Sequence, residues 1–195
     1  MEIIAHRVNT LEQLSVLPIT SGAEVDLRDS GSRIILQHDP FKGGEDFEAF
    51  LANYRHGTLI LNVKSERIEH KALELLQHYG ITRFFFLDSS IPMCVLLSGA
   101  GETRLALRFS EFEGLDTIMK MKGRAQWVWV DCFTQLPLNR ESYLAIKGAG
   151  YKLCLVSPEL QGRPENIENY RNLVEANNFI FDAVCSKQAY INRWI

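Results

Sequence analysis

Short apolar runs that alternate with helical patterns most constrain the fold of this 195-residue chain. Each apolar run is followed by a segment with hydrophobic residues at helical spacing. Buried strands separated by helices are typical of a parallel sheet covered by helices. From residue 58 onward, the expected strands span 58–64, 83–87, 104–108, 125–130, 151–156 and 180–185, and the expected helices span 67–79, 92–97, 115–121, 142–147 and 164–177.

The first part of the chain adds two more strand positions, at 3–7 and 23–28. The turn signal Asp29-Ser30-Gly31-Ser32 predicts that 33–37 returns beside the second strand as a hairpin. Eight strand positions predict an α/β fold, a compact (β/α)8 TIM barrel of parallel strands with a β-hairpin at the second strand. A doubly wound open sheet is the alternative, but the Gly-rich dinucleotide fingerprint is absent.

Composition predicts one soluble domain over residues 1–195. The hydrophobic content of 46%, the charged content of 23% and the net charge of -3 are ordinary, and no basic run indicates nucleic-acid binding. No apolar run has transmembrane length, and the first residues lack the pattern of a secretory signal, so we expect a cytoplasmic protein. The four cysteines lack CxxC spacing and are expected to be buried thiols. The oligomeric state stays open.

Polar side chains gather where the expected strands end, and in a TIM barrel this rim holds the active site. Exposed loop starts alone would explain several of them. His6 and Arg7 are different, because a His-Arg pair directly after Ile-Ile-Ala is an unusual way to end a core strand without a partner anion. The rim residues are His6, Arg7, Glu24, Asp26, His38, Asn62, Lys64, Asp88, Arg108, Glu111, Asp131, Glu159 and Lys187.

Four short motifs in the first 65 residues resemble the glycerophosphodiester phosphodiesterases, and more broadly the phosphatidylinositol-phospholipase-C-like phosphodiesterase superfamily. The chain looks like a short, divergent member. Beyond these motifs only the architecture is shared, and that family also has a (β/α)8 barrel. The motifs are Ile4-Ala5-His6-Arg7, Glu24-Val25-Asp26, His38-Asp39 and Asn62-Val63-Lys64.

The resemblance implies a role for each motif. Histidine titrates near neutral pH and can take or give a proton, and cations stabilise the charge that builds up on a phosphodiester under attack. Two carboxylates on one strand face suit a hard cation. The implied roles are catalytic for His6 and His38 (general base and general acid), phosphate-binding for Arg7 and Lys64, and metal-binding for Glu24, Asp26 and Asn62, with Mg²⁺ or Ca²⁺ as the cofactor.

The chain departs from the family pattern at the third strand, where the family has Glu-x-Lys and this chain has Asn62-Val63-Lys64. An amide oxygen brings no charge, so we expect weaker metal binding. The first loop is shorter, and no inserted subdomain follows His38-Asp39, so we expect a more open site. Asp88, Glu111 and Asp131 are candidates for a third acid, and Arg108 for a phosphate or sugar hydroxyl. Alternatively, ion pairs with Arg7, Arg28 or Lys64 compensate Glu24 and Asp26.

These observations predict metal-assisted hydrolysis of a small, glycerophosphodiester-like phosphodiester by a His/His acid-base pair, that is, a phosphoric diester hydrolase. Two alternatives remain open. One is a catalytically inactive barrel that binds a phosphorylated ligand or a protein partner. The other is a lyase or isomerase that acts on a phosphorylated sugar, because barrels support many chemistries.

Overall fold

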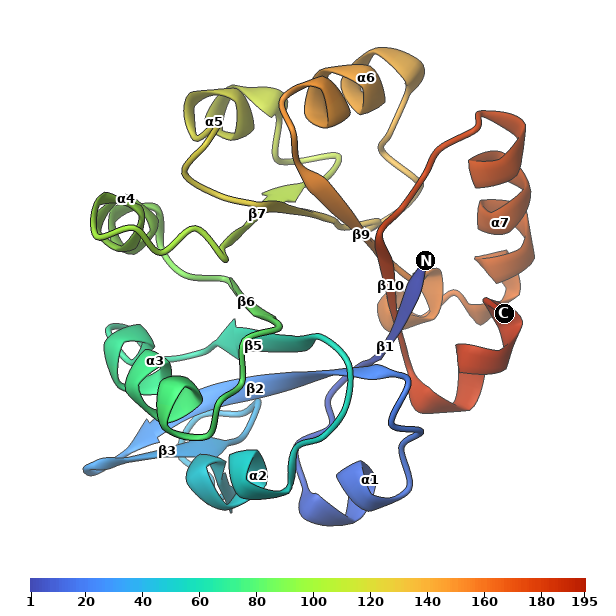
Figure 1. The fold of residues 1–195 in the computed structure, drawn as a ribbon. Coiled ribbons are helices and arrows are strands. Elements are labelled where there is room, and N and C mark those ends of the chain that lie inside the picture. Colours follow the sequence, from blue (N-terminus) through green and yellow to red (C-terminus); the bar gives the residue numbers. More distant parts are fainter.

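The computed structural model describes residues 1–195, in which strands and helices alternate around a curled sheet (Figure 1). Eight strands pair in parallel in the order β6-β5-β2-β1-β10-β9-β8-β7. They are β1 (Glu2–Ala5), β2 (Gly22–Ser30), β5 (Leu59–Val63), β6 (Phe84–Leu87), β7 (Ala106–Phe109), β8 (Trp127–Val130), β9 (Lys152–Val156) and β10 (Ala183–Ser186).

The two ends of this curled sheet meet at β6 and β7. Their contact is a single parallel bridge between Phe86 and Leu105, and the Phe86 amide donates to the Arg104 carbonyl at 2.9 Å. Residues 104–105, which the sequence predicts as strand, therefore lie outside β7 because only this bridge pairs them. The seam between β6 and β7 is much less extensively hydrogen-bonded than the other strand pairs.

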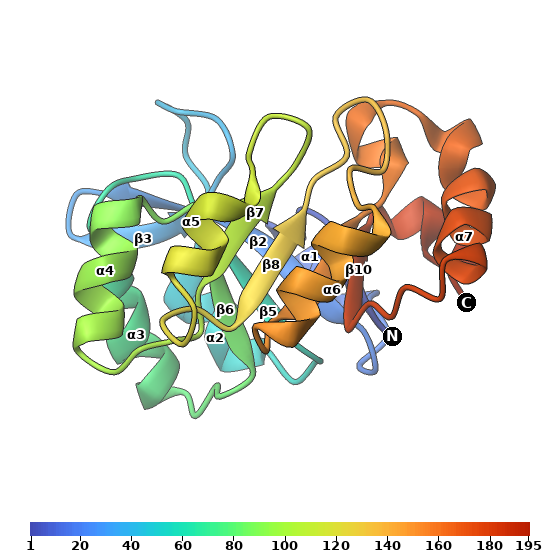
Figure 2. The ribbon, with the colours of Figure 1, turned by 90° about the horizontal axis from the view of Figure 1, so that it is seen from above.

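Two short antiparallel strands extend the sheet beside β2. Strand β3 (Arg33–Leu36) pairs with the end of β2, from Leu27 opposite Leu36 to Ser30 opposite Arg33. Strand β4 (Glu45–Asp46) pairs with β3 in turn. The loop between β3 and β4 contains His38, and it rises beside the loops that follow β7 and β8 (Figure 2).

Helices cover the outer face of the curled sheet (Figure 1). They begin and end within a few residues of the predicted limits, and none is long and apolar enough to cross a membrane. They are α1 (Leu11–Ser15), α2 (Phe47–Asn53), α3 (Glu69–His78), α4 (Ile91–Gly99), α5 (Leu115–Lys120), α6 (Arg140–Gly148) and α7 (Ile167–Ala176), with 3₁₀ helices at Pro158–Gln161, Pro164–Asn166 and Gln188–Arg193.

The hydrophobic core has two parts. The larger part lies between the sheet and the helices, and the smaller part fills the inside of the curled sheet. Trp127 and Trp129 belong to the inner part and are therefore core residues. All four cysteines are buried and unpaired, which is also as predicted. The inner core fills the interior of the curled sheet up to the carboxyl ends of the strands, where polar side chains lie instead.

We predict that Gly22→Ala destabilises the fold. A Cβ at Gly22 would lie 2.3 Å from the Thr58 carbonyl oxygen, so the backbone between β1 and β5 would have to move. Overpacking of this kind costs roughly 1–3 kcal/mol in the free energy of unfolding, measurable by urea denaturation. Gly43→Ala is the matched control, because a Cβ there meets no atom within 4 Å. Equal stability of the two variants would contradict the prediction.

Candidate functional site

Two acidic side chains from β2 and one amide from β5 form the base of a polar site at the carboxyl ends of the strands. Side chains alternate along β2, so Glu24 and Asp26 both point inside the curled sheet, where both are fully buried. Asp26 is paired with Asn62 in the register of β2 and β5. The sequence therefore brings Glu24, Asp26 and Asn62 together, as predicted.

Neutral donors hold the carboxylate of Glu24. One oxygen accepts from the Arg7 amide at 2.7 Å, and the other accepts from Asn62 Nδ2 at 2.8 Å. Nε2 of His6 lies 3.8 Å from Glu24 Oε2. Burial, together with the nearby Asp26 carboxylate, raises the pKa of Glu24 to about 7. Near neutral pH, Glu24 is therefore poised between its protonated and ionised forms.

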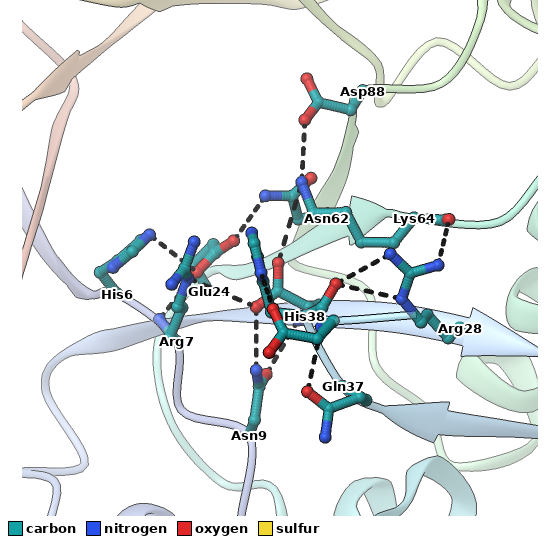
Figure 3. A network of polar contacts seen from close by, with 12 residues as sticks. His6, Arg7, Asn9, Glu24, Arg28, Gln37, His38, Asn62, Lys64 and Asp88 are labelled. Atoms are coloured by element: carbon teal, nitrogen blue, oxygen red, sulfur yellow. Dashed lines mark hydrogen bonds and ion pairs between the residues drawn. The ribbon is translucent and has the colours of Figure 1, made fainter. Parts of the chain in front are cut away.

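Asp26 is held by Asn9, a residue that the sequence analysis missed. Asn9 Nδ2 donates to Asp26 Oδ2 at 2.8 Å, and the Asp26 amide donates to Asn9 Oδ1 at 2.9 Å (Figure 3). Two cations lie near its carboxylate, with Arg7 Nε at 3.8 Å and Lys64 Nζ at 3.9 Å. Ion pairing with Arg7 and Lys64 thus compensates part of the buried charge, as the alternative explanation for Glu24 and Asp26 expects.

The two histidines have different surroundings. His6 is largely buried, and burial together with the positive charges of Arg7 and Lys187 lowers its pKa to about 3. His38 is more exposed, and its Nδ1 lies 2.9 Å from Asp39 Oδ1. Hydrogen bonds from His38 and Lys42 lower the pKa of Asp39 to about 2, so this carboxylate is ionised. His6 is therefore neutral, and His38 has an anionic partner.

Arg28 fixes the ends of two strands instead of pairing with an acid. Its Nε and Nη2 donate to the His38 carbonyl at 3.1 and 2.8 Å, and its Nη1 donates to the Lys64 carbonyl at 2.9 Å (Figure 3). The suggestion that Arg28 pairs with Glu24 or Asp26 is wrong, since all three of its guanidinium nitrogens donate to these carbonyls. Arg28 instead ties the backbone of His38 to that of Lys64.

The predicted phosphate ligands and both histidines line one open cavity of about 540 Å³. One side of this cavity is cationic, with Arg7 and Lys64. The opposite side is aromatic, with the exposed rings of Phe112 and Phe133, whose centroids are 5.7 Å apart. The complete lining is His6, Arg7, His38, Asn62, Lys64, Arg108, Phe112, Glu113, Trp129, Asp131, Phe133, Val156, Leu160 and Gln161.

The remaining rim acids serve other partners. Arg108 donates to Asp88 at 2.7 and 3.0 Å and also pairs with Asp131, while Lys64 Nζ lies 3.2 Å from Asp88. Glu111 accepts hydrogen bonds from the backbone amides of 133–135. Asp88, Asp131 and Glu111 are therefore engaged away from Glu24, and two acids already compensate Arg108.

Three residues present oxygens suited to a hard cation. Asp26 Oδ1 and Asn62 Oδ1 are buried without a hydrogen-bond partner, and Glu24 lies beside them on β2. Orphaned buried oxygens next to a carboxylate pair fit a divalent cation with oxygen ligands. The chain contains no group of three or more His, Cys, Asp or Glu side chains placed to hold a metal, so the third ligand would be an amide.

Comparison with known proteins places this geometry on a known fold. No family model and no curated protein matches the chain. The glycerophosphodiester phosphodiesterase of Agrobacterium tumefaciens str. C58 superposes with a TM-score of 0.68, at 16% identity, over 96% of this chain and 97% of that one. The chain has the fold of that enzyme. The fold thus agrees with the resemblance that the four sequence motifs indicate.

A second solved structure gives the same result. A glycerophosphoryl diester phosphodiesterase from Parabacteroides distasonis ATCC 8503 superposes with a TM-score of 0.65, at 13% identity, over 97% of this chain and 84% of that chain. The likeness extends through the second half of the chain, where no motif carries it. The curled sheet has its helices on the outer face (Figure 1), which differs from the doubly wound open sheet of the alternative, where helices cover both faces.

We predict that Glu24 makes stability depend on pH. The folded pKa of about 7 lies above the value of 4.5 for an unperturbed glutamate, so folding favours the protonated acid. This contribution is complete below pH 4.5 and is lost as the pH rises through 7. In EDTA, the free energy of unfolding of the wild type relative to Glu24→Gln should fall by roughly 2–3 kcal/mol between pH 4.5 and 7.5. A difference that does not change with pH would refute the shift.

Proposed function

We propose that the chain cleaves small phosphodiesters of the glycerophosphodiester class. The observation that carries the proposal is the shared cavity, in which two imidazoles lie beside Arg7 and Lys64. Binding of an anion alone does not require two imidazoles, whereas phosphodiester cleavage needs one group to take a proton and another to give one. We also propose that residues 1–195 form one domain, in which the eight parallel strands make a closed (β/α)8 barrel with a hairpin at β2.

Arg7 and Lys64 bind the phosphate in this proposal. Both cations are already close to Asp26, so neither is free of a carboxylate before substrate binds. As negative charge builds up on the phosphoryl oxygens during attack, the two cations stabilise it more strongly than they stabilise the ground state. One alcohol of the substrate lies towards the aromatic side of the cavity, at Phe112 and Phe133.

The two histidines divide the proton transfers. His6 is neutral and takes the proton from the attacking oxygen, which is an internal hydroxyl of the substrate or a water molecule. The new O–P bond forms as the bond from phosphorus to the leaving oxygen breaks. His38, whose Nδ1 lies 2.9 Å from the Asp39 carboxylate, gives a proton to the leaving alkoxide. An internal hydroxyl would give a cyclic phosphate.

Glu24, Asp26 and Asn62 would hold the divalent cation, Mg²⁺ or Ca²⁺. When bound, the cation supplies a positive charge that polarises phosphoryl oxygens. The chain's own contribution is to keep the three oxygen ligands in place. Asn9 holds Asp26 through two hydrogen bonds, and the Arg7 amide holds Glu24. Cation binding is accompanied by loss of the Glu24 proton, because the pKa of Glu24 is raised to about 7 when no cation is bound.

We predict that His38→Ala abolishes most turnover. Removal of a general acid lowers the rate roughly 10²–10⁴-fold, and we would measure hydrolysis of a panel of glycerophosphodiesters and of a chromogenic phosphodiester with and without Mg²⁺ or Ca²⁺. His70→Ala is the matched control, since His70 is exposed on α3 and lies outside the cavity. Absence of turnover by the folded wild type would sink the proposal and favour the ligand-binding alternative.

We predict that Asn62→Asp strengthens cation binding. A third carboxylate adds a charged ligand, and we expect Mg²⁺ or Ca²⁺ to bind roughly tenfold more tightly, measured by isothermal titration calorimetry. The same variant should be less stable than the wild type in EDTA, because three acids would then repel one another in a buried site. If Asn62→Asp leaves the affinity unchanged, Asn62 does not lie at the cation.

A further inference from the structure

Lys187 lies beside the proposed site but takes no part in the mechanism above. It is exposed and directly follows β10, which pairs with β1 (Figure 1). His6, Arg7 and Lys187 line a second cavity, of about 300 Å³, together with Val8, Gln13 and Gln188. His6 and Arg7 thus face two cavities, the larger one with Lys64 and His38 and the smaller one with Lys187.

A buried carboxylate fixes the backbone at this position. Glu159 is almost fully buried, and its Oε1 accepts from the Lys187 amide at 3.0 Å and from Ser186 Oγ at 2.6 Å. Its other oxygen accepts from Ser157 Oγ. These neutral donors offset the cost of burying the carboxylate. The start of the Lys187 side chain is therefore held in place, and only the four-carbon stem is free to adjust.

Lys187 differs from the other rim cations in having no carboxylate nearby. Arg7 and Lys64 lie within 4.0 Å of Asp26, and Arg108 pairs with Asp88 and Asp131. No carboxylate oxygen lies within 4.0 Å of the Lys187 ammonium.

We propose that Lys187, with Gln13 and Gln188, forms a second anion subsite for a terminal phosphate of the substrate. The subsite rests on the proposed function, since it makes the substrate a phosphodiester in which one alcohol carries a further phosphate. The scissile phosphate would lie in the larger cavity and the terminal phosphate in the smaller one. Lys187 donates from an ammonium and the two glutamines from amide groups, which matches the acceptor oxygens of a phosphate.

Arg7 lines both cavities and suits a doubly anionic ligand. Its backbone has φ 55°, which is uncommon for a residue with a side chain, and its amide is tied to Glu24. Its guanidinium is about half exposed and has one distant acidic partner, so several donors remain available. A single guanidinium can therefore contact the scissile phosphate on one side while Lys187 binds the terminal phosphate on the other.

The test measures binding and turnover separately. Calorimetry compares ethane-, propane- and butanediol bisphosphates with the matching alkyl monophosphates, on the wild type, Lys187→Gln and the control Lys120→Gln. Lys120 is exposed on α5 and lines neither cavity. At least one bisphosphate should bind the wild type about tenfold more tightly than its monophosphate, and Lys187→Gln should remove most of that preference while monophosphate binding stays unchanged.

Two results would overturn the subsite. One is a wild type that binds no bisphosphate more tightly than its monophosphate, and the other is an equal loss for both ligands in Lys187→Gln. Turnover of glycerophosphoglycerol, with and without a terminal phosphate, tests the proposed function in parallel. Loss of the bisphosphate preference in Lys187→Gln, with no turnover of any diester, would confirm the subsite and refute the catalytic proposal. The binding result thus separates a failure of the anion subsite from a failure of the catalytic proposal.

Discussion

The site depends on burying two carboxylates, Glu24 and Asp26, side by side on one strand. Like charges in a low-dielectric interior are unfavourable unless donors or cations surround them. Asn9, Asn62 and the Arg7 amide supply hydrogen bonds to this pair, and Arg7 and Lys64 supply positive charge at just under 4 Å. The rest of the rim is built around this carboxylate pair, because the cations that compensate it also form one side of the cavity.

A second layer of contacts holds that first group in position. Arg28 ties the carbonyl of His38 to that of Lys64, so the β3–β4 loop and the end of β5 keep a fixed separation. Glu159 does the same for Ser157 and Ser186 at the ends of β9 and β10. Both are charged residues that bind backbone or hydroxyl groups instead of an oppositely charged side chain. They hold the strand ends of the rim in place and leave the charged side chains that face the cavities free to bind a ligand.

Much of the fold was predictable from the sequence because strands and helices have distinct periodicities. The apolar runs located all eight parallel strands, and the turn at residues 29–32 located the return of β3 beside β2. Residues 180–182 were predicted as strand but precede β10, because the chain bends at Asp182 directly before the strand begins. Periodicity does not report such local backbone geometry.

The site was predictable in its composition but not in its partners. The motifs located the seven proposed residues, and the structure brings them to one end of the sheet. The role of Asn9 was not visible, since an asparagine in a loop looks like an ordinary helix cap. Arg28 was considered as an ion-pair partner of Glu24 and Asp26, whereas it binds carbonyls. Arg108 was considered for a phosphate or sugar hydroxyl, whereas it is paired with two acids. Such pairings depend on distances across strands, which a single sequence does not contain.

The two halves of the chain form two arcs of the sheet, β1 to β6 and β7 to β10, which meet at the sparse seam between β6 and β7 and at the fully paired strands β1 and β10. The arc from β1 to β6 carries the histidines, the acids and the cations that we propose to bind phosphate. The arc from β7 to β10 carries the aromatic side of the cavity at Phe112 and Phe133, and Lys187 at its far end. Loops on the second arc can therefore diversify under selection without disturbing the histidines on the first arc that we propose to transfer protons. A lineage with this fold could change what it accepts while preserving how it reacts.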